Sequence, residues 1–319
     1  MRVNIIAGFL GSGKTTLLKN VLGGLVQREK IAVLVNEFGD VGLDGSTLQG
    51  ESIDMIELAS GCICCSMKAD LMKAAQEIAT RINPHRLFIE ATGIARPLDV
   101  LETLSHPEVM PLLSFEPVVT VIDASKFFLF LRRLPHLYEA QIKSADLLVL
   151  NKTDLVDSGD LKEVRSILKK IALGIPIIET SFCVLEAGFL SNEGLHRAFP
   201  SAGSPIPKRL SLKDSSRHEH EHESRNPFRS FTYREKGTIS EARLRDFLET
   251  LPEDTFRIKG YINLPEGTAF LNYSAGNYQL DPFPEPRENC LVFVGLDLEK
   301  GELLEMLHKC IIEKGGKCD

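Results

Sequence analysis

The stretch that decides the fold is Gly8-Phe9-Leu10-Gly11-Ser12-Gly13-Lys14-Thr15, which matches the phosphate-binding pattern G-x-x-x-x-G-K-S/T. The apolar residues 3–7 before it predict a strand, and the residues after it predict a helix. Glycines at such a turn let backbone N–H groups face phosphate oxygens, and the helix N-terminus adds its positive dipole end. The pattern therefore predicts a nucleotide phosphate site rather than an ordinary glycine-rich turn.

The side chains of this loop have separate expected roles. Lys14 is expected to reach the β- and γ-phosphates and to take part in catalysis, and the Thr15 hydroxyl to bind Mg²⁺. Thr16 is expected to contact the α-phosphate side. The predicted nucleotide-binding residues here are Gly8, Gly11, Ser12, Gly13, Lys14, Thr15 and Thr16.

Up to about residue 200, short apolar runs alternate with helical patterns. Several runs are continuously apolar, as in strands that helices cover on both faces. The expected strands are residues 3–7, 31–36, 53–58, 87–90, 118–123, 147–150 and 176–179, and the expected helices include 67–82 and 161–171. This alternation predicts an α/β fold with a doubly wound, mostly parallel sheet of the P-loop NTPase type.

The character of the chain changes after residue 200. Residues 201–226 are rich in Ser, Pro, His and charge, which is typical of a flexible linker. Beyond them, expected strands at 230–233, 256–258, 269–273 and 291–294 accompany helical patterns at 244–251 and 303–311. The predicted organisation is a nucleotide domain (1–200), a His-containing linker (201–226) and a smaller C-terminal α+β domain (227–319).

Composition narrows the class of protein. The formal net charge of −7 and a pI near 5.7 argue against nucleic acid as a main partner. The closest candidate for a membrane span, residues 127–131, is far shorter than the roughly 20 residues required, and it predicts a buried helical segment. Seven cysteines, three of them within four residues, suit a metal site in a reducing compartment better than disulfides. We therefore expect a cytoplasmic protein without membrane partners.

The nucleotide base has its own predicted reader, Asn151-Lys152-Thr153-Asp154, directly after an apolar strand. The Asp154 carboxylate can accept hydrogen bonds from the N1–H and the exocyclic amine of guanine, whereas adenine lacks both donors. The Lys152 stem can lie over the base while Asn151 ties this loop to the phosphate loop. The motif therefore favours GTP and GDP over ATP.

A cysteine cluster, Cys62-Ile63-Cys64-Cys65, follows the expected strand 53–58 and a Ser-Gly turn. In a loop, the thiolates of Cys62, Cys64 and Cys65 can converge on one soft or borderline ion: Zn²⁺, with Cu⁺ and Co²⁺ as alternatives. Three ligands leave one tetrahedral position open, which suits an exchangeable metal. The competing interpretations are buried core thiols or a redox pair. The remaining cysteines are predicted to be core thiols (Cys183, Cys290 and Cys310) or an exposed tail thiol (Cys318).

Two acidic residues follow strands where nucleotide-sensing segments are expected. Glu37, in Asn36–Asp44, can coordinate Mg²⁺, position water or complete the metal site. Glu90, in Glu90-Ala91-Thr92-Gly93, ends an apolar strand as a Walker B-like acid would. Both are candidate catalytic residues, and an ordinary polar loop is the alternative for each.

Histidines alternate with glutamates in His218-Glu219-His220-Glu221-His222. In an extended chain, this spacing places the three imidazoles of His218, His220 and His222 on one side, where they can gather Zn²⁺, Ni²⁺ or Co²⁺ weakly. A solvated, charged linker is the alternative interpretation.

Together these segments resemble the CobW-like metallochaperone GTPases, relatives of the nickel-insertion GTPases of urease and hydrogenase maturation. The resemblance rests on GFLGSGKTT, NEFGDVGLD, GCICC, EATG, NKTD and the later Arg257-Ile258-Lys259-Gly260, and it spans essentially the whole chain. This chain differs from the family's usual E-S-T-G motif, because Ala91 stands in place of Ser. The chain also begins at its first strand, so we do not expect the docking tail that some eukaryotic members carry.

The resemblance implies a GTPase that moves Zn²⁺, or in some members cobalt, into a client metalloprotein, with the cysteine cluster as the metal site. Without an identifiable arginine finger, we expect slow intrinsic turnover, of roughly 10⁻⁴ to 10⁻² per second. The sequence is compatible with a homodimer. Two other functions stay open: a metal-sensing GTP switch or buffer without client delivery, and a P-loop kinase or ATPase with structural cysteines.

Overall fold

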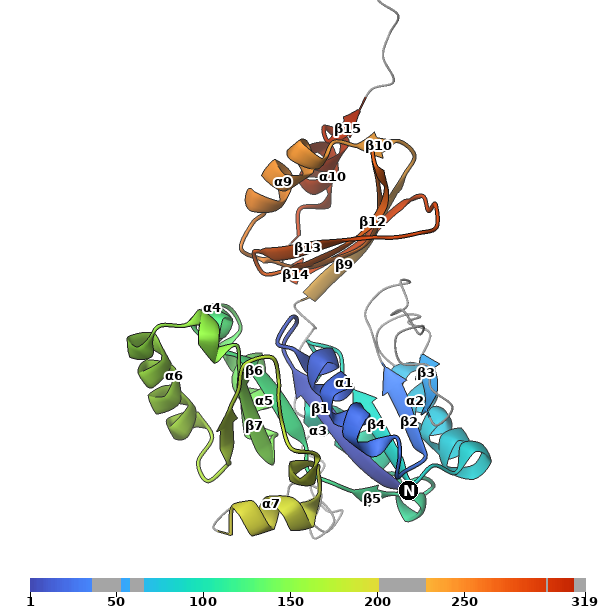
Figure 1. Cartoon of the computed structure of the whole chain (residues 1–319), viewed down its shortest axis with the longest axis vertical. Coiled ribbons are helices and arrows are strands. Elements are labelled where there is room, and N and C mark those ends of the chain that lie inside the picture. The colour runs from blue at the N-terminus through green and yellow to red at the C-terminus, as the bar shows by residue number, and fades with distance from the viewer. Residues whose placement is uncertain (36–52, 58–65, 201–227, 297, 313–319) are drawn as a thin grey trace, which may run out of the picture. The chain divides into compact units, whose positions relative to one another are not determined.

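The computed structural model describes residues 1–35, 53–57, 66–200, 228–296 and 298–312 (Figure 1). Contacts divide the chain into two units, one holding the described residues up to 200 and the other holding the described residues from 228 on. The predicted linker at 201–226 lies outside the described residues, so the three predicted domain boundaries stay predictions.

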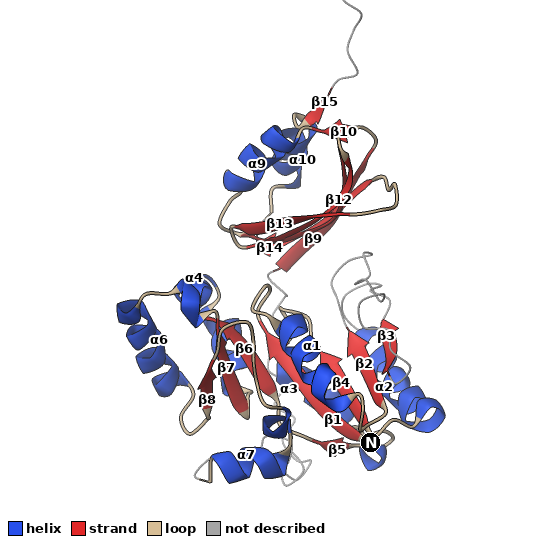
Figure 2. Ribbon diagram, in the orientation of Figure 1, coloured by secondary structure: helices blue, strands red, loops and turns tan. Residues whose placement is uncertain are grey.

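The first unit is built on a parallel sheet, as the sequence predicted (Figure 2). Its strands run in the order β3-β2-β4-β1-β6-β7-β8, with the short β5 beside β1, and all the pairs are parallel. The strands are β1 (Arg2–Gly8), β2 (Ile31–Val35), β3 (Ile53–Glu57), β4 (Arg86–Glu90), β5 (Ser114–Phe115), β6 (Val119–Asp123), β7 (Leu147–Asn151) and β8 (Ile177–Glu179).

Helices cover both faces of this sheet, which is why nearly every residue of its central strands β1, β4, β6 and β7 is buried. They are α1 (Lys14–Leu25), α2 (Ser66–Glu77), α3 (Pro97–Leu104), α4 (Phe127–Arg133), α5 (Pro135–Lys143), α6 (Ser158–Ile171) and α7 (Asn192–Ala198). A π-helical segment, Ile78–Ile82, extends α2 and completes the predicted helix at 67–82. Helix α6 begins three residues earlier than predicted because Asp157 caps it, accepting hydrogen bonds from the backbone N–H groups of Gly159 and Asp160.

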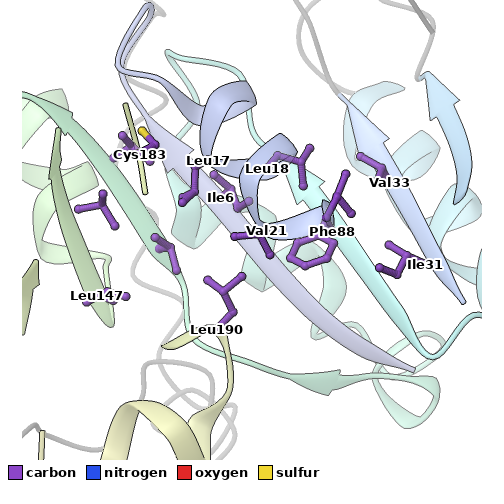
Figure 3. Packing of buried hydrophobic residues seen from close by; sticks show 14 of the residues in the cluster. Ile6, Leu17, Leu18, Val21, Ile31, Val33, Phe88, Leu147, Cys183 and Leu190 are labelled. Carbon is purple, nitrogen blue, oxygen red and sulfur yellow. The ribbon is translucent and has the colours of Figure 1, made fainter. Parts of the chain in front are cut away.

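Neighbouring residues of β1 point into two different cores. Ile6 joins Leu17 and Val21 of α1 in one cluster, which Figure 3 shows together with Phe88 of β4. Ile5 joins the opposite cluster, to which α2 and α3 contribute. The alternation is the two-residue period of a strand, and β1 is therefore buried on both faces of the sheet.

The second unit is an antiparallel α+β domain. Its main sheet has the order β13-β12-β11-β14-β9, and its core includes residues of two helices packed on the sheet. The elements are β9 (Phe228–Glu235), β10 (Thr238–Ile239), α9 (Glu241–Glu249), β11 (Thr255–Leu264), β12 (Gly267–Ser274), β13 (Asn277–Pro282), β14 (Asn289–Leu296), α10 (Lys300–His308) and β15 (Ile311–Ile312). Strand β13 was missed by the sequence prediction, because it is an edge strand with only two side chains packed on the core, Tyr278 and Leu280, among exposed residues.

The described helices include none that is both long enough and apolar enough to span a membrane. The predicted buried segment at 127–131 lies in α4, where Phe127 and Phe130 are buried.

Candidate functional site

The phosphate loop connects β1 to α1 at the carboxyl end of the central strand. Three of its glycines, Gly8, Gly11 and Gly13, have positive φ angles of 134°, 73° and 111°. A Cβ on Gly13 would lie 2.6 Å from Asn151 Nδ2 and 2.8 Å from Cys183 Sγ. The loop is therefore a cradle that only glycine can form at this position.

Polar groups inside the loop fit a bound phosphate chain. The buried Lys14 ammonium donates a hydrogen bond to the Phe9 carbonyl oxygen at 3.2 Å. The Ser12 hydroxyl is buried and has no hydrogen-bond partner among the described residues. Thr16 is exposed on the first turn of α1. Hydrogen-bonding groups therefore line the loop where the sequence predicted phosphate contacts.

Thr15 and Glu90 are brought together by the sheet. Glu90 ends β4, which pairs directly with β1 in the register Ile6 to Glu90. The Thr15 hydroxyl donates a hydrogen bond of 2.9 Å to Glu90 Oε1. A hydroxyl and a carboxylate at this spacing are oxygen ligands of the kind that Mg²⁺ prefers. The structure thus pairs the two residues that the sequence proposed separately for metal binding and catalysis.

The predicted base reader lies beside the phosphate loop. Asn151 ends β7 and is buried; its Nδ2 donates to the Ser12 carbonyl oxygen at 2.9 Å, as predicted for a residue that ties the two loops together. Lys152 follows with a left-handed backbone (φ 60°), and Asp154 is exposed. The Lys152 ammonium lies 2.7 Å from Asp123 Oδ2.

A third loop, missed by the sequence analysis, completes this corner. The backbone N–H of Cys183 donates to Asn151 Oδ1 at 2.9 Å, and Cys183 Sγ donates to the Gly13 carbonyl oxygen at 3.3 Å. Asn20 of α1 donates to the carbonyl oxygens of Phe182 and Cys183 at 2.9 and 3.1 Å. The sequence feature that could have identified this loop is its position after β8, a parallel strand whose carboxyl end lies at the same edge of the sheet as the phosphate loop and the base loop.

Cys183 is the buried core thiol that the sequence predicted, and it also forms part of the wall of the phosphate loop. Burial raises its pKa to about 12, and the charge of Asp123 acts in the same direction, while Lys152 opposes both. Cys310 is likewise buried, whereas Cys290 is only partly buried on β14, so its prediction as a core residue was wrong. Cys318 lies outside the described residues.

Gln141, also missed, anchors the segment that follows Glu90. Its Nε2 donates from α5 to the carbonyl oxygens of Gly93 and Ala95 at 3.1 and 2.9 Å. A Cβ on Gly93 would lie 2.6 Å from the Leu10 nitrogen, so this segment packs directly against the phosphate loop. No local pattern marks Gln141, since its role depends on how α5 packs.

The remaining predicted site residues lie outside the described residues: Glu37, Cys62, Cys64, Cys65, His218, His220 and His222. Among the residues that the structure describes, no group of three or more His, Cys, Asp or Glu side chains is placed to hold a metal ion. The metal assignments therefore stay predictions from the sequence.

Comparison with known proteins gives matches over both units. The nucleotide-binding domain model of CobW/HypB/UreG matches residues 2–179, and the C-terminal domain model of the cobalamin synthesis protein CobW matches residues 228–311. A Sinorhizobium protein named zinc chaperone CobW is 32% identical over 92% of each chain. Its Pseudomonas aeruginosa namesake is 30% identical over 97% of this chain and 91% of its own. A Schizosaccharomyces pombe protein, named zinc-regulated GTPase metalloprotein activator 1, is 36% identical over 56% of this chain and 46% of its own.

Proposed function

Because this chain belongs to the CobW/HypB/UreG family of nucleotide-binding proteins, we propose that it couples GTP hydrolysis to the transfer of Zn²⁺ into a client metalloprotein. The chain is a GTPase. The observation that carries the proposal is the meeting of the phosphate loop, the Glu90 segment and the base loop at one edge of the sheet. The names of its relatives, zinc chaperones and a GTPase metalloprotein activator, support zinc as the cargo.

Guanine nucleotide would be held at both ends by separate loops. The backbone of Gly11–Thr16 cradles the phosphates, with Lys14 turning from the Phe9 carbonyl to the β- and γ-phosphates. Asp154 reads the guanine edge, and Asn151 keeps the two loops at a constant separation. An unmatched base leaves the Asp154 carboxylate without its donors, which is the source of discrimination against adenine.

Mg²⁺ suits the same site, since Thr15 and Glu90 present oxygen ligands at 2.9 Å from each other. When bound, the ion supplies positive charge that neutralises the β- and γ-phosphate oxygens. Thr15 would hold it through its hydroxyl, and Glu90 would hold it directly or orient its water. Glu37 is proposed as a further acid near the γ-phosphate. Turnover would be slow, because the sequence pattern identifies no arginine finger.

Zn²⁺ is the proposed cargo, with Co²⁺ as the alternative ion. The sequence places Cys62, Cys64 and Cys65 after β3, whose carboxyl end lies at the same edge of the parallel sheet as the phosphate loop. Three thiolates leave the fourth tetrahedral position for exchange with a client. His218, His220 and His222 would collect metal weakly and pass it on.

Coupling requires that the nucleotide state change the affinity for the metal. Reversing a two-state switch from 1:99 to 99:1 takes roughly 5.5 kcal/mol of differential binding. A second candidate function, a metal-sensing GTP switch or buffer, would bind Zn²⁺ at the same cysteines and deliver none. The proposed metal transfer, unlike the switch or buffer, requires a client metalloprotein that receives Zn²⁺. The proposal is compatible with a homodimer.

The test is Zn²⁺ affinity measured by competition with a chelator, with GDP and with a non-hydrolysable GTP analogue. We expect at least a tenfold difference between nucleotide states, and loss of tight binding in Cys64→Ala. Cys290→Ala is the matched control, because Cys290 is a partly buried cysteine of the second unit. Equal affinity in both nucleotide states would refute coupling and favour the buffer.

A further inference from the structure

Asp123 is a buried carboxylate whose two oxygens both have partners. It is the last residue of β6, and its side chain is 3% exposed. Oδ2 lies 2.7 Å from the Lys152 ammonium. Oδ1 accepts hydrogen bonds from the backbone N–H and the hydroxyl of Ser125 at 2.9 and 2.6 Å. The Ser125 contacts fix the rotation of the carboxylate and so fix where the lysine ammonium is held.

Lys152 is constrained at its other end by its backbone. Its φ angle of 60° is in the left-handed region, and the next residue, Thr153, donates its backbone N–H to the Thr180 carbonyl oxygen at 3.4 Å. In the sheet, Asp123 lies directly opposite Asn151, the residue before Lys152. The lysine stem therefore runs between a fixed backbone and a fixed ammonium.

We propose that Asp123 is a positioning residue for base recognition, which holds Lys152 so that its stem forms a preformed platform for the guanine ring. A free lysine side chain has many rotamers, and ordering it in advance lowers the entropic cost of binding. The platform contacts the face of the base, whereas Asp154 reads its edge. Asp123 therefore raises affinity for purine nucleotides without choosing between them. The inference rests on the proposed nucleotide site and is independent of zinc.

The alternative role for Asp123 is structural, since it also caps the short turn Ala124–Lys126. A comparison of GDP with IDP, which lacks the exocyclic amine, separates contact with the face of the base from recognition of its edge. Asp123→Asn is expected to raise the Kd of both by about tenfold while leaving their ratio unchanged. Asp154→Ala is expected to change the ratio. Competition against a fluorescent guanine nucleotide measures both constants.

Asp146→Asn is the matched control for loss of a buried carboxylate. Asp146 lies next to the other end of β7, where Oδ2 accepts a hydrogen bond from the Val118 backbone N–H at 2.9 Å. It is far along the strand from the base loop, so both Kd values should stay within about twofold of wild type. A similar loss of affinity in Asp146→Asn would overturn the inference, because it would trace the effect to the fold.

A double-mutant cycle with Lys152→Met tests whether Asp123 acts through the lysine. The double variant should bind GDP no more weakly than Lys152→Met alone. If Asp123→Asn does not fold, Ser125→Ala takes its place, because this substitution loosens the Asp123 carboxylate and keeps the charges of Asp123 and Lys152. We expect a rise of about threefold in both Kd values, which on a logarithmic scale is about half the tenfold rise expected for Asp123→Asn.

Unchanged affinity, a changed GDP/IDP ratio or additive losses would overturn the role of Asp123. Wild-type protein that binds neither nucleotide would instead refute the proposed site, and the inference with it. Failure of zinc transfer alone leaves the inference intact.

Discussion

The side-chain amide of Asn151 donates a 2.9 Å hydrogen bond to the carbonyl oxygen of Ser12, which lies 139 residues earlier in the chain. The same side chain accepts a hydrogen bond from the Cys183 backbone, so one buried residue joins three loops at the carboxyl edge of the sheet. The distance between the phosphate cradle and the base reader is set by this residue rather than by either loop alone.

Asn151→Ala should therefore weaken nucleotide binding and destabilise the first unit together. The substitution leaves the Ser12 carbonyl and the Cys183 N–H buried without their partner, at a cost of about 1–3 kcal/mol each. Calorimetric titration with GDP should show at least a tenfold loss of affinity, and thermal unfolding a lower Tm.

Asn289→Ala is the control for that variant. Asn289 is an equally buried asparagine of the second unit, where it binds the backbone of Asn263, Glu235 and Gly237. It should lower stability and leave GDP affinity unchanged. Equal loss of GDP affinity in both variants would contradict the role assigned to Asn151.

Gly13→Ala should abolish nucleotide binding through geometry alone. The new methyl group would meet Asn151 Nδ2 at 2.6 Å and Cys183 Sγ at 2.8 Å, on a backbone with φ at 111°. Gly23→Ala on α1 is the control, since nothing lies within 4 Å of its Cβ. We expect Gly13→Ala to lose GDP affinity by about 100-fold or more. Gly23→Ala should bind GDP with unchanged affinity, and its free energy of unfolding should rise by about 0.5–1 kcal/mol. Detectable GDP binding near wild-type affinity in Gly13→Ala would exclude this geometry.

Glu90→Gln should slow hydrolysis and leave the fold intact. A glutamine oxygen can still accept the Thr15 hydrogen bond, but the negative charge beside the proposed Mg²⁺ is lost. The kcat for GTP should fall by about 100-fold, and more Mg²⁺ should be needed for half-maximal rate. Glu116→Gln is the control, because Glu116 is a buried acid that accepts a hydrogen bond from the Asn192 backbone. Hydrolysis within twofold of wild type in Glu90→Gln would remove Glu90 from the mechanism.

Cys183 should resist alkylation in the native protein. Burial raises its pKa from 9.0 to about 12, so at pH 8 only about one thiol in ten thousand is ionised, against about one in ten when unfolded. Mass spectrometry after iodoacetamide treatment should show labelling at least about 100-fold slower in native protein than in urea.

The pH dependence follows from the same shift in pKa. Labelling of native Cys183 should rise about tenfold per pH unit up to pH 10, without a plateau near 9. Above pH 9 the unfolded state releases this proton and the folded state keeps it, so the thiol lowers stability as pH rises. A plateau near pH 9 would show that the thiol is not held in this environment.

Much of the fold could be predicted from local pattern. The parallel sheet followed from continuously apolar strands alternating with helices, and each observed strand of the first unit except β5 overlaps a predicted one. Strand β13 was missed because its alternation is short: only Tyr278 and Leu280 of this edge strand pack against the core, and its other residues are exposed.

In the candidate site, too, some residues could be proposed from local sequence and others could not. Gly8, Lys14, Thr15 and the Asn151-Lys152-Thr153-Asp154 reader could be proposed because each motif lies within one short segment, where residue order alone suggests the chemistry. Glu90 could be proposed because it ends a buried strand. Asp123 ends its strand in the same way, and it was missed because its partner Lys152 lies 29 residues away.

By itself, the sequence predicted which residues could carry the chemistry, since glycine conformation, the hydrogen-bonding groups of amides and carboxylates, and thiolate softness belong to the residues themselves. The tertiary structure decided which of them meet. Cys183 and Gly13 are 170 residues apart, and Thr15 and Glu90 are 75 apart. Only the order of the strands, with β1 between β4 and β6, brings those loops to a common edge, because neighbours in a parallel sheet are set by packing over the whole domain.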